Sequence, residues 1–305
     1  MSISLTPTQI RQALERSGYL MEQRIVPVLG RHGYFVTPNH EYEDPDTGKS
    51  REIDIHALNL VSLYRRDYDD LLTSTILASC KNNHLPIVLF THANMLRGVD
   101  AAMSIPKTGF PLEVERSGSS DSIETFLRLG NYHHYYSVHR VASQYCRLKE
   151  TKQGKNVDYM ADHGDLHDDL DSLIKAVNAE ILEYKPLPSY LNSLNLKEEE
   201  DDINLVLIYP VIIFAGEMYE CRQTKQGVII RASNHIVFVR RVKSRVIKGE
   251  FFVDFVRESY LNRYLTVIQR EFETIEKRLR SNRKLLRKNV MREMRALAES
   301  TTTRV

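Results

Sequence analysis

The run from Arg51 to Ala57 limits the fold more than any other feature of this sequence. Its apolar and polar side chains alternate strictly, with Ile53, Ile55 and Ala57 set between Glu52, Asp54 and His56. A period of two predicts a β-strand that buries one face and keeps its polar residues together on the other. The sequence therefore predicts that the carboxylate of Asp54 lies on the polar face of a sheet.

A second predicted strand covers residues 71–81 and ends with Ser79 and Lys81. These two residues are two positions apart, so their side chains share one face of a strand. The Asp, Pro and Gly residues between Asp44 and Lys49 favour a turn, which predicts a hairpin leading into the first strand. Two strands that carry a carboxylate and an amine towards one point predict a functional site.

Periodicity also predicts the remaining elements. We expect helices over 6–17, 19–31, 124–148 and 166–184, strands over 34–36 and 86–90, a β-rich block over 205–256, and a long helix or helix pair over 259–300. This order predicts an α/β protein with four regions. They are a core at 1–125, a helical insertion at 126–200, a β-rich block at 201–258 that packs on or continues the core sheet, and a basic C-terminal helix at 259–305.

Composition argues against membrane and disulfide-rich proteins. Hydrophobic residues make up 42% of the 305 residues, which is enough to fill a sizeable core. The sequence contains no run of 18 apolar residues and no signal-peptide pattern, so we expect a cytoplasmic protein that does not enter a membrane. The three cysteines, Cys80, Cys146 and Cys221, are widely spaced, which fits a reducing compartment.

The charge of the chain is uneven. The whole chain carries a net charge of +2, yet the segment from Lys277 to Arg295 contains nine basic residues and a single acid, Glu293. Such a segment is typical of a nucleic-acid contact through backbone phosphates, and we place that contact at four residues, Arg283, Lys284, Arg287 and Lys288. The alternatives are a solvated helix that packs on acidic surface of its own chain or of a partner, or one that mediates self-association.

Glu22, Asp54 and Lys81 together have the chemistry of a hydrolytic metal site. Carboxylate oxygens are hard ligands suited to Mg²⁺, which usually takes one or two protein carboxylates and completes its shell with water and substrate phosphate. An ammonium group beside such a site can orient the attacking water or offset negative charge in the transition state. The sequence therefore predicts Mg²⁺ or Mn²⁺ as the cofactor.

The order of these motifs resembles the PD-(D/E)xK nuclease superfamily, which has the restriction-endonuclease-like fold. More narrowly, it is similar to bacterial members with the patterns GxxxE, DPxTGKxREIDIxA and ECKxxxxPxxxF. These appear here at Gly18–Glu22, Asp44–Ala57 and Ser79–Phe90. The resemblance implies a restriction-endonuclease-like core with a central mixed sheet flanked by helices, and hydrolysis of phosphodiester bonds in DNA, in bacterial defence or DNA processing.

The resemblance also implies a role for each residue. Asp54 would be the central metal ligand, Glu22 a second carboxylate supplied by a helix, and the backbone carbonyl of Cys80 a further ligand. Lys81 would act on the attacking water.

One position departs from the family pattern. Where the pattern has an acid two residues before the lysine, this chain has Ser79. A hydroxyl removes one negative charge, which weakens the hold on a divalent cation. Either Glu52, on the same face as Asp54, replaces the missing acid and a nuclease survives, or the domain binds nucleic acid or a protein partner without cutting.

The adjacent residues His133, His134, Tyr135 and Tyr136 form a second conspicuous group. We interpret them as a surface or packing cluster of a helix rather than a set of metal ligands.

Overall fold

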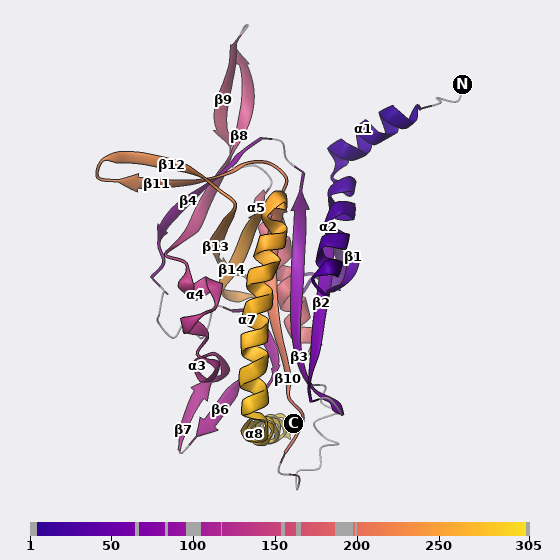
Figure 1. Ribbon diagram of the computed structural model, residues 1–305, viewed down its shortest axis with the longest axis vertical. Helices are drawn as coiled ribbons and strands as arrows, with labels where there is room; N and C mark the ends of the chain where they lie inside the picture. Colours follow the sequence, from indigo (N-terminus) through magenta and orange to yellow (C-terminus); the bar gives the residue numbers. More distant parts are fainter. Residues whose placement is uncertain are drawn as a thin grey trace.

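The computed structural model describes residues 5–64, 67–82, 85–95, 105–116, 118–153, 156–162, 166–186, 198 and 200–302. These residues form an α/β structure built around one large mixed sheet of twelve strands, with helices on both faces (Figure 1). The general α/β class predicted from the sequence is confirmed.

The chain begins with two helices, α1 (Pro7–Ser17) and α2 (Tyr19–Arg31). Thr6 and Gln9 form a capping box at the start of α1, where each side chain satisfies a backbone N–H of the other residue. Gly18 separates the helices at φ 90°, a left-handed conformation that side chains other than hydrogen disfavour. Because this turn redirects the chain, α1 projects from the body while α2 lies on the sheet (Figure 1).

Three strands follow as an antiparallel meander: β1 (Phe35–Glu43), β2 (Ser50–Tyr64) and β3 (Asp67–Lys81). The hairpin predicted at residues 44–49 is confirmed. Asp44 holds its turn together, since its buried carboxylate accepts hydrogen bonds from Arg51 at 2.6 Å and from Lys175 at 3.0 Å.

β3 pairs in parallel with the next strand of the sheet, β10 (Asn204–Phe214). Parallel neighbours require a crossover connection, and that connection includes α5 (Leu166–Glu183), which packs on one face of the sheet. Ten of the strand positions in β10 are buried, in agreement with the continuous apolar run of a strand that is covered on both faces.

The remaining strands extend the sheet in the order β1-β2-β3-β10-β14-β13-β8-β4-β11-β12. Their bounds are β4 (Ile87–Ala93), β8 (Arg140–Gln153), β11 (Met218–Thr224), β12 (Gly227–Ser233), β13 (His235–Lys243) and β14 (Lys248–Arg257). Two short strands join at the side, β5 (Lys107–Phe110) on β10 and β9 (Asn156–Asp162) on β8, and β6 (Glu113–Arg116) pairs with β7 (Ser119–Ser122) as a separate hairpin. The β-rich block predicted at 201–258 therefore continues the core sheet.

The helix predicted over residues 124–148 is wrong for most of its length. Only α3 (Ile123–Leu127), a 3-10 turn (Leu129–Asn131) and α4 (His134–Ser137) are helical, and residues 140–153 form β8 between β4 and β13. The register of β8 slips beside β4, where Phe90 pairs with Gln144 and Thr91 with Ala142. This bulge adds one residue to β8 and interrupts its alternation, so the apolar residues have a helix-like spacing. Region 126–200 is accordingly not a purely helical insertion.

Two further helices complete the fold after a 3-10 turn (Glu258–Tyr260): α7 (Leu261–Ser281) and α8 (Arg283–Thr302). The prediction of a long helix or a helix pair over residues 259–300 is confirmed as a pair. α7 lies with α2 on the sheet face opposite α5, and α8 lies across one end of the molecule (Figure 1). In the part of the chain that the structure describes, no helix combines the length and apolar character needed to cross a membrane.

Candidate functional site

The predicted residues meet where β2 begins and β3 ends. Asp54 lies on β2 next to the last residues of β3, and its Oδ2 accepts a hydrogen bond of 2.6 Å from the backbone N–H of Cys80. The Ser79 hydroxyl donates a second hydrogen bond to the same oxygen over 3.3 Å. Ser79, which stands where the pattern of the resembled family has an acid, therefore helps to fix the orientation of Asp54.

Glu22 approaches from α2. Met21, Ile25 and Leu29 bury one side of this helix against the sheet, which leaves Glu22 at the edge of the contact, partly buried. Burial raises the pKa of Glu22, the nearby carboxylate of Asp54 raises it further, and Lys81 partly offsets the increase. The structure thus brings Glu22, Asp54 and Lys81 within electrostatic range of one another, as the sequence predicts.

Lys81 makes a contact that sequence reasoning missed. Its Nζ lies 2.8 Å from Oδ1 of Asp169, and both side chains are partly exposed. Asp169 belongs to the first turn of α5, more than eighty residues further along the chain. Acids are common in the first turn of a helix, because they complement the helix dipole. The presence of Asp169 there therefore gave no sign in the sequence that it contacts Lys81.

The two other predicted metal ligands are placed differently. The Cys80 side chain is partly buried, and burial together with the carboxylates of Asp54 and Glu22 raises the pKa of its thiol well above the usual value. Cys80 therefore acts here through its backbone, whose N–H holds Asp54. Glu52 is exposed and pairs with Glu41 of β1 in the sheet register. A role for Glu52 in place of the missing acid stays a prediction.

The donor set fits a hard cation with few protein ligands. Within the described ranges, no three carboxylate, imidazole or thiol atoms around Asp54 come within 4.8 Å of one another. Mg²⁺ tolerates this arrangement, because one or two carboxylates are enough when water and phosphate complete its shell. Burial first and the carboxylate of Asp54 second raise the pKa of Glu22, and a divalent cation between the two carboxylates would offset their repulsion.

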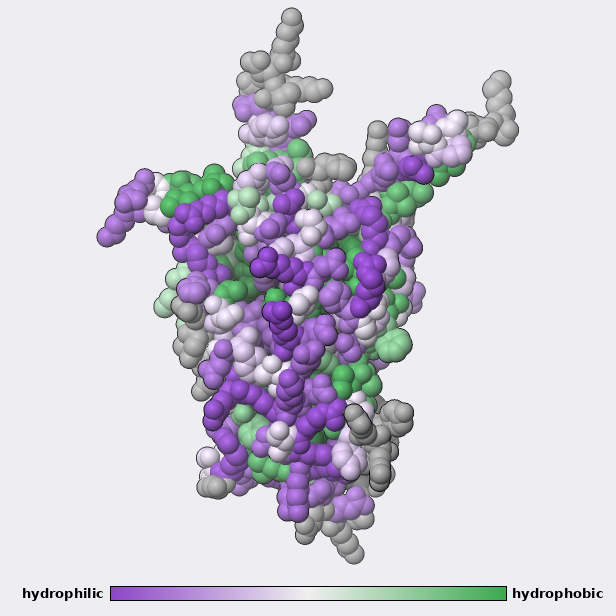
Figure 2. Space-filling view, viewed as in Figure 1, coloured by the Kyte–Doolittle hydropathy of each residue, from purple (hydrophilic) through white to green (hydrophobic). Residues whose placement is uncertain are grey.

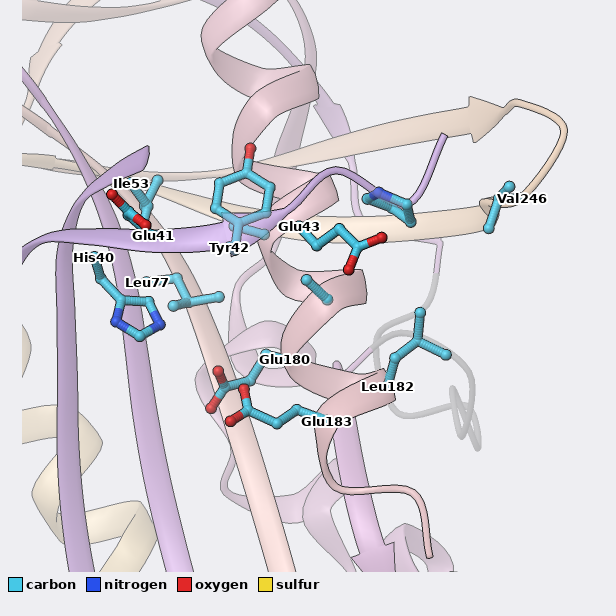
Figure 3. A pocket seen from close by; sticks show the side chains of 13 residues that line it. His40, Glu41, Tyr42, Glu43, Ile53, Leu77, Glu180, Leu182, Glu183 and Val246 are labelled. Carbon is cyan, nitrogen blue, oxygen red and sulfur yellow. The ribbon is translucent and has the colours of Figure 1, made fainter. Parts of the chain in front are cut away.

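A groove of about 580 Å³ lies beside this site, between β1 and α5 (Figure 3). Ile53 and Leu77, from the same two strands that carry the site, form part of its lining. Four carboxylates also line it, those of Glu41, Glu43, Glu180 and Glu183. Figure 3 shows Glu180 and Glu183 close to each other on the α5 side, across from His40 of β1. An acidic lining repels phosphate, so this groove does not suit a nucleic-acid backbone.

The predicted basic contact is largely occupied within the chain. Arg283 and Arg287 both pair with the fully buried carboxylate of Asp70, the latter at 3.0 Å, and Arg287 also reaches Asp202 at 2.5 Å. Lys284 and Lys288 are exposed. Figure 1 places α8 at the end of the molecule opposite the one towards which β3 points. The structure therefore favours packing on acidic surface of the same chain for the two arginines.

The apolar side of α8 is likewise covered by its own chain. Leu286, Val290 and Met294 are buried in the main core. Self-association through this helix would have to use its polar side, and it stays a prediction.

Comparison with models of known protein families, with curated proteins and with solved structures finds no match to this chain.

Proposed function

We propose that this protein is a metal-dependent nuclease with a restriction-endonuclease-like core, acting on phosphodiester bonds in DNA. The single observation that carries the proposal is the convergence of Glu22, Asp54 and Lys81, from α2, β2 and β3, at one end of the central strands. The core assignment is supported by one structural unit, which consists of α2, β1, β2, β3, α5 and β10. Its four strands are neighbours in the sheet, and the unit contains every residue of the site.

Each residue then has a defined task. Cys80 and Ser79 fix one oxygen of Asp54, so its other oxygen would be the one to hold the metal, and Glu22 would add a second carboxylate. Mg²⁺ or Mn²⁺, when bound, would supply an activated water and offset charge on the phosphate. Lys81 would orient the attacking water or stabilise negative charge in the transition state.

Asp169 supplies the acid that the strand lacks. In the family pattern this acid would stand at position 79, two residues before the lysine. Here the carboxylate comes from α5, and it contacts the Lys81 amine at 2.8 Å. This contact restricts the position of Lys81 and adds a carboxylate to the site, so the number of acids is close to that of the pattern. Retention of this acid favours an active site over a degenerate one.

Substrate contacts are better placed on the β11–β12 hairpin than on α8. This hairpin, α1 and the β8–β9 hairpin project from the end of the molecule towards which β3 points (Figures 1 and 2). The hairpin carries Arg222, Lys225 and Arg231, whereas its acid Glu220 is paired with Arg140 at 3.0 Å. Its uncompensated charge is therefore positive, which suits backbone phosphates.

The test is cleavage of plasmid and single-stranded DNA in Mg²⁺ or Mn²⁺. Asp54→Ala and Lys81→Ala are expected to reduce the rate by about 100-fold or more, since general acid–base and electrostatic roles each contribute on that order. Asp169→Asn should lower the rate as well, whereas Asp168→Asn, on the same turn but exposed, should not. Equal rates for Asp54→Ala and the parent protein would refute the assigned site.

The second candidate is a nuclease-derived module that binds nucleic acid or a protein partner without cutting it. Ser79 is the observation in its favour, because one strand acid is absent. DNA binding by the parent protein without cleavage in either metal, unchanged by Asp54→Ala, would establish this candidate instead.

A further inference from the structure

A second cluster of titratable side chains lies between the sheet and α7. It joins His134 of α4, His235 of β13, Asp254 of β14 and Glu271 of α7. Asp254 is fully buried, and it faces α7, whereas the Asp54 site borders α5. The proposed nuclease mechanism uses none of these four residues.

Asp254 is the centre of the cluster. Its Oδ1 lies 2.7 Å from Nε2 of His235, and its Oδ2 lies 3.1 Å from Nε2 of His134. Two tyrosine hydroxyls, of Tyr135 at 3.0 Å and Tyr264 at 2.8 Å, donate to the same Oδ2. These four donors satisfy the lone-pair sites of the buried carboxylate, and two of them are imidazoles, which are also metal ligands.

We propose that His134, His235 and Asp254 bind a tetrahedral transition-metal cation of the Zn²⁺ class. Their ligand atoms lie within 4.8 Å of one another. Ligands about 2.0 Å from a tetrahedral Zn²⁺ are about 3.3 Å apart. The separations are 2.7 Å from Oδ1 of Asp254 to His235 and 3.1 Å from Oδ2 to His134, so the side chains would have to move apart by about 0.6 and 0.2 Å to admit the cation.

The surroundings of the three ligands match those of a metal centre. Nδ1 of His134 faces the carboxylate of Glu271 at 3.0 Å, and a bound cation would replace the proton that Nε2 shares with Asp254. A carboxylate on the far nitrogen of a ligating histidine is the usual way to orient the ring and raise its basicity. The tyrosine hydroxyls orient Asp254 in the same way. Two imidazoles and one carboxylate suit Zn²⁺ better than Mg²⁺.

The neighbouring trio of His133, His134 and Glu271 is a poorer site although its atoms are equally close. Nδ1 of His133 accepts a hydrogen bond from the backbone N–H of Tyr135, which puts the ring proton on Nε2. Nε2 is the atom that would have to bind the metal, so this tautomer excludes it.

The charge balance and the access route fit as well. Once a cation has displaced the ring protons that face Asp254, the two carboxylates of Asp254 and Glu271 would offset its two positive charges in full. The His235 side chain keeps 20% of its surface exposed, whereas His134 and Asp254 are almost completely buried. Entry and a fourth ligand such as water are therefore on the His235 side. Bound metal would join α4, β13 and β14, so its effect is on stability rather than on the reaction.

The experiment measures metal content and Co²⁺ absorption of the full chain. The parent protein is expected to retain close to one Zn²⁺ per chain and to give the intense visible bands of tetrahedral Co²⁺ on substitution. His235→Ala should weaken Zn²⁺ binding by about 100-fold or more, since removal of even an orienting neighbour costs 10–100-fold. His92→Ala, an exposed histidine on β4, is the matched control and should bind as the parent does.

Asp54→Ala separates this proposal from the nuclease proposal. It should abolish cleavage and leave the Zn²⁺ content and the Co²⁺ spectrum unchanged. Absence of stoichiometric Zn²⁺ from the parent protein, together with an octahedral Co²⁺ spectrum, would overturn the second site. So would Zn²⁺ binding that His235→Ala leaves intact. Circular dichroism of His235→Ala verifies that the variant is folded.

Discussion

At the scale of single residues, Ser79 decides how the Asp54 site is charged. It is 5% exposed, and its hydroxyl donates to Asp54. A carboxylate at this position would restore the acid of the family pattern and would lie directly beside Asp54. The two charges repel each other without a cation and share one when it is present.

Ser79→Glu is therefore expected to act in opposite directions with and without metal. In chelator, the variant should be less stable than the parent by about 1–3 kcal/mol, as expected for a buried charge that lacks a partner. In Mg²⁺, its metal affinity and cleavage rate should rise. Ser79→Gln, of similar size and neutral, is the control. A Ser79→Glu protein whose stability does not depend on Mg²⁺ would contradict the placement of a cation at Asp54.

Asp44 gives a prediction for the dependence of stability on pH. Burial alone would raise the pKa of this carboxyl group, but Lys175, the backbone N–H of Asp46 and Arg51 outweigh it and lower the pKa to about 2. Because the folded-state pKa is depressed, the stabilisation is present above the unfolded pKa of about 3.9 and is lost as pH falls towards 2.

Asp44→Asn should cost about 2 kcal/mol at pH 7, a typical value for hydrogen bonds to charged partners. The difference from the parent protein should shrink between pH 4 and pH 2, as followed by urea unfolding. Glu43→Gln, an exposed neighbour on β1, is the control and should change stability little. A difference that stays constant over this range would show that Asp44 is not ionised in the fold.

At the scale of elements, α8 illustrates how a charged segment can serve packing. Arg283 and Arg287 converge on Asp70 at the start of β3, and the Asp70 carboxylate also accepts a hydrogen bond from the backbone N–H of Ile203 at 2.9 Å. Removal of Asp70 would leave two partly buried guanidinium groups without their main partner, which is costly in a site of low solvent access.

We expect Asp70→Asn to lower the free energy of unfolding by about 3 kcal/mol. Lys284→Ala, at an exposed position of the same helix, should change it by less than about 0.5 kcal/mol. Denaturant unfolding measures both. If Arg287→Ala weakened DNA binding without loss of stability, the phosphate contact predicted from the sequence would be correct after all.

At the scale of the whole molecule, the site and the projecting elements lie at the same end. α1 and the β8–β9 and β11–β12 hairpins extend beyond the sheet there, and the apolar residues Val228 and Ile230 of β12 are 60% exposed (Figures 1 and 2). A hairpin that keeps apolar and basic side chains in solvent is suited to a large partner.

The charge of the β11–β12 hairpin should determine the salt dependence of DNA binding. Reversal of Lys225 and Arg231 to Glu is expected to weaken binding at low salt. It should also reduce the slope of log K against log salt by roughly 1 for each phosphate that the hairpin no longer neutralises. The corresponding double variant of Lys284 and Lys288 on α8 is the control. If the control changed the slope and the hairpin variant did not, the DNA would bind at α8.

The sequence by itself determined the local parts of this protein. Strict alternation around Asp54 and the Asp44 turn specify the β1–β2 hairpin, because side-chain direction in a strand and turn chemistry depend only on near neighbours. The same local reasoning failed at β8, where a bulge opposite Phe90 disrupts the alternation, and there pairing with β4 and β13 decided the conformation.

Only the tertiary structure decided which distant groups meet. Asp169 reaches Lys81 because α5 crosses over between two parallel strands, and Arg287 reaches Asp70 because α8 folds back across the start of β3. His134, His235 and Asp254 likewise come from three elements, and no spacing in the sequence links them. The charge and type of a residue can be read from the sequence, but its contacts depend on how the entire chain packs. The contact between Lys81 and Asp169 could therefore be found only in the tertiary structure.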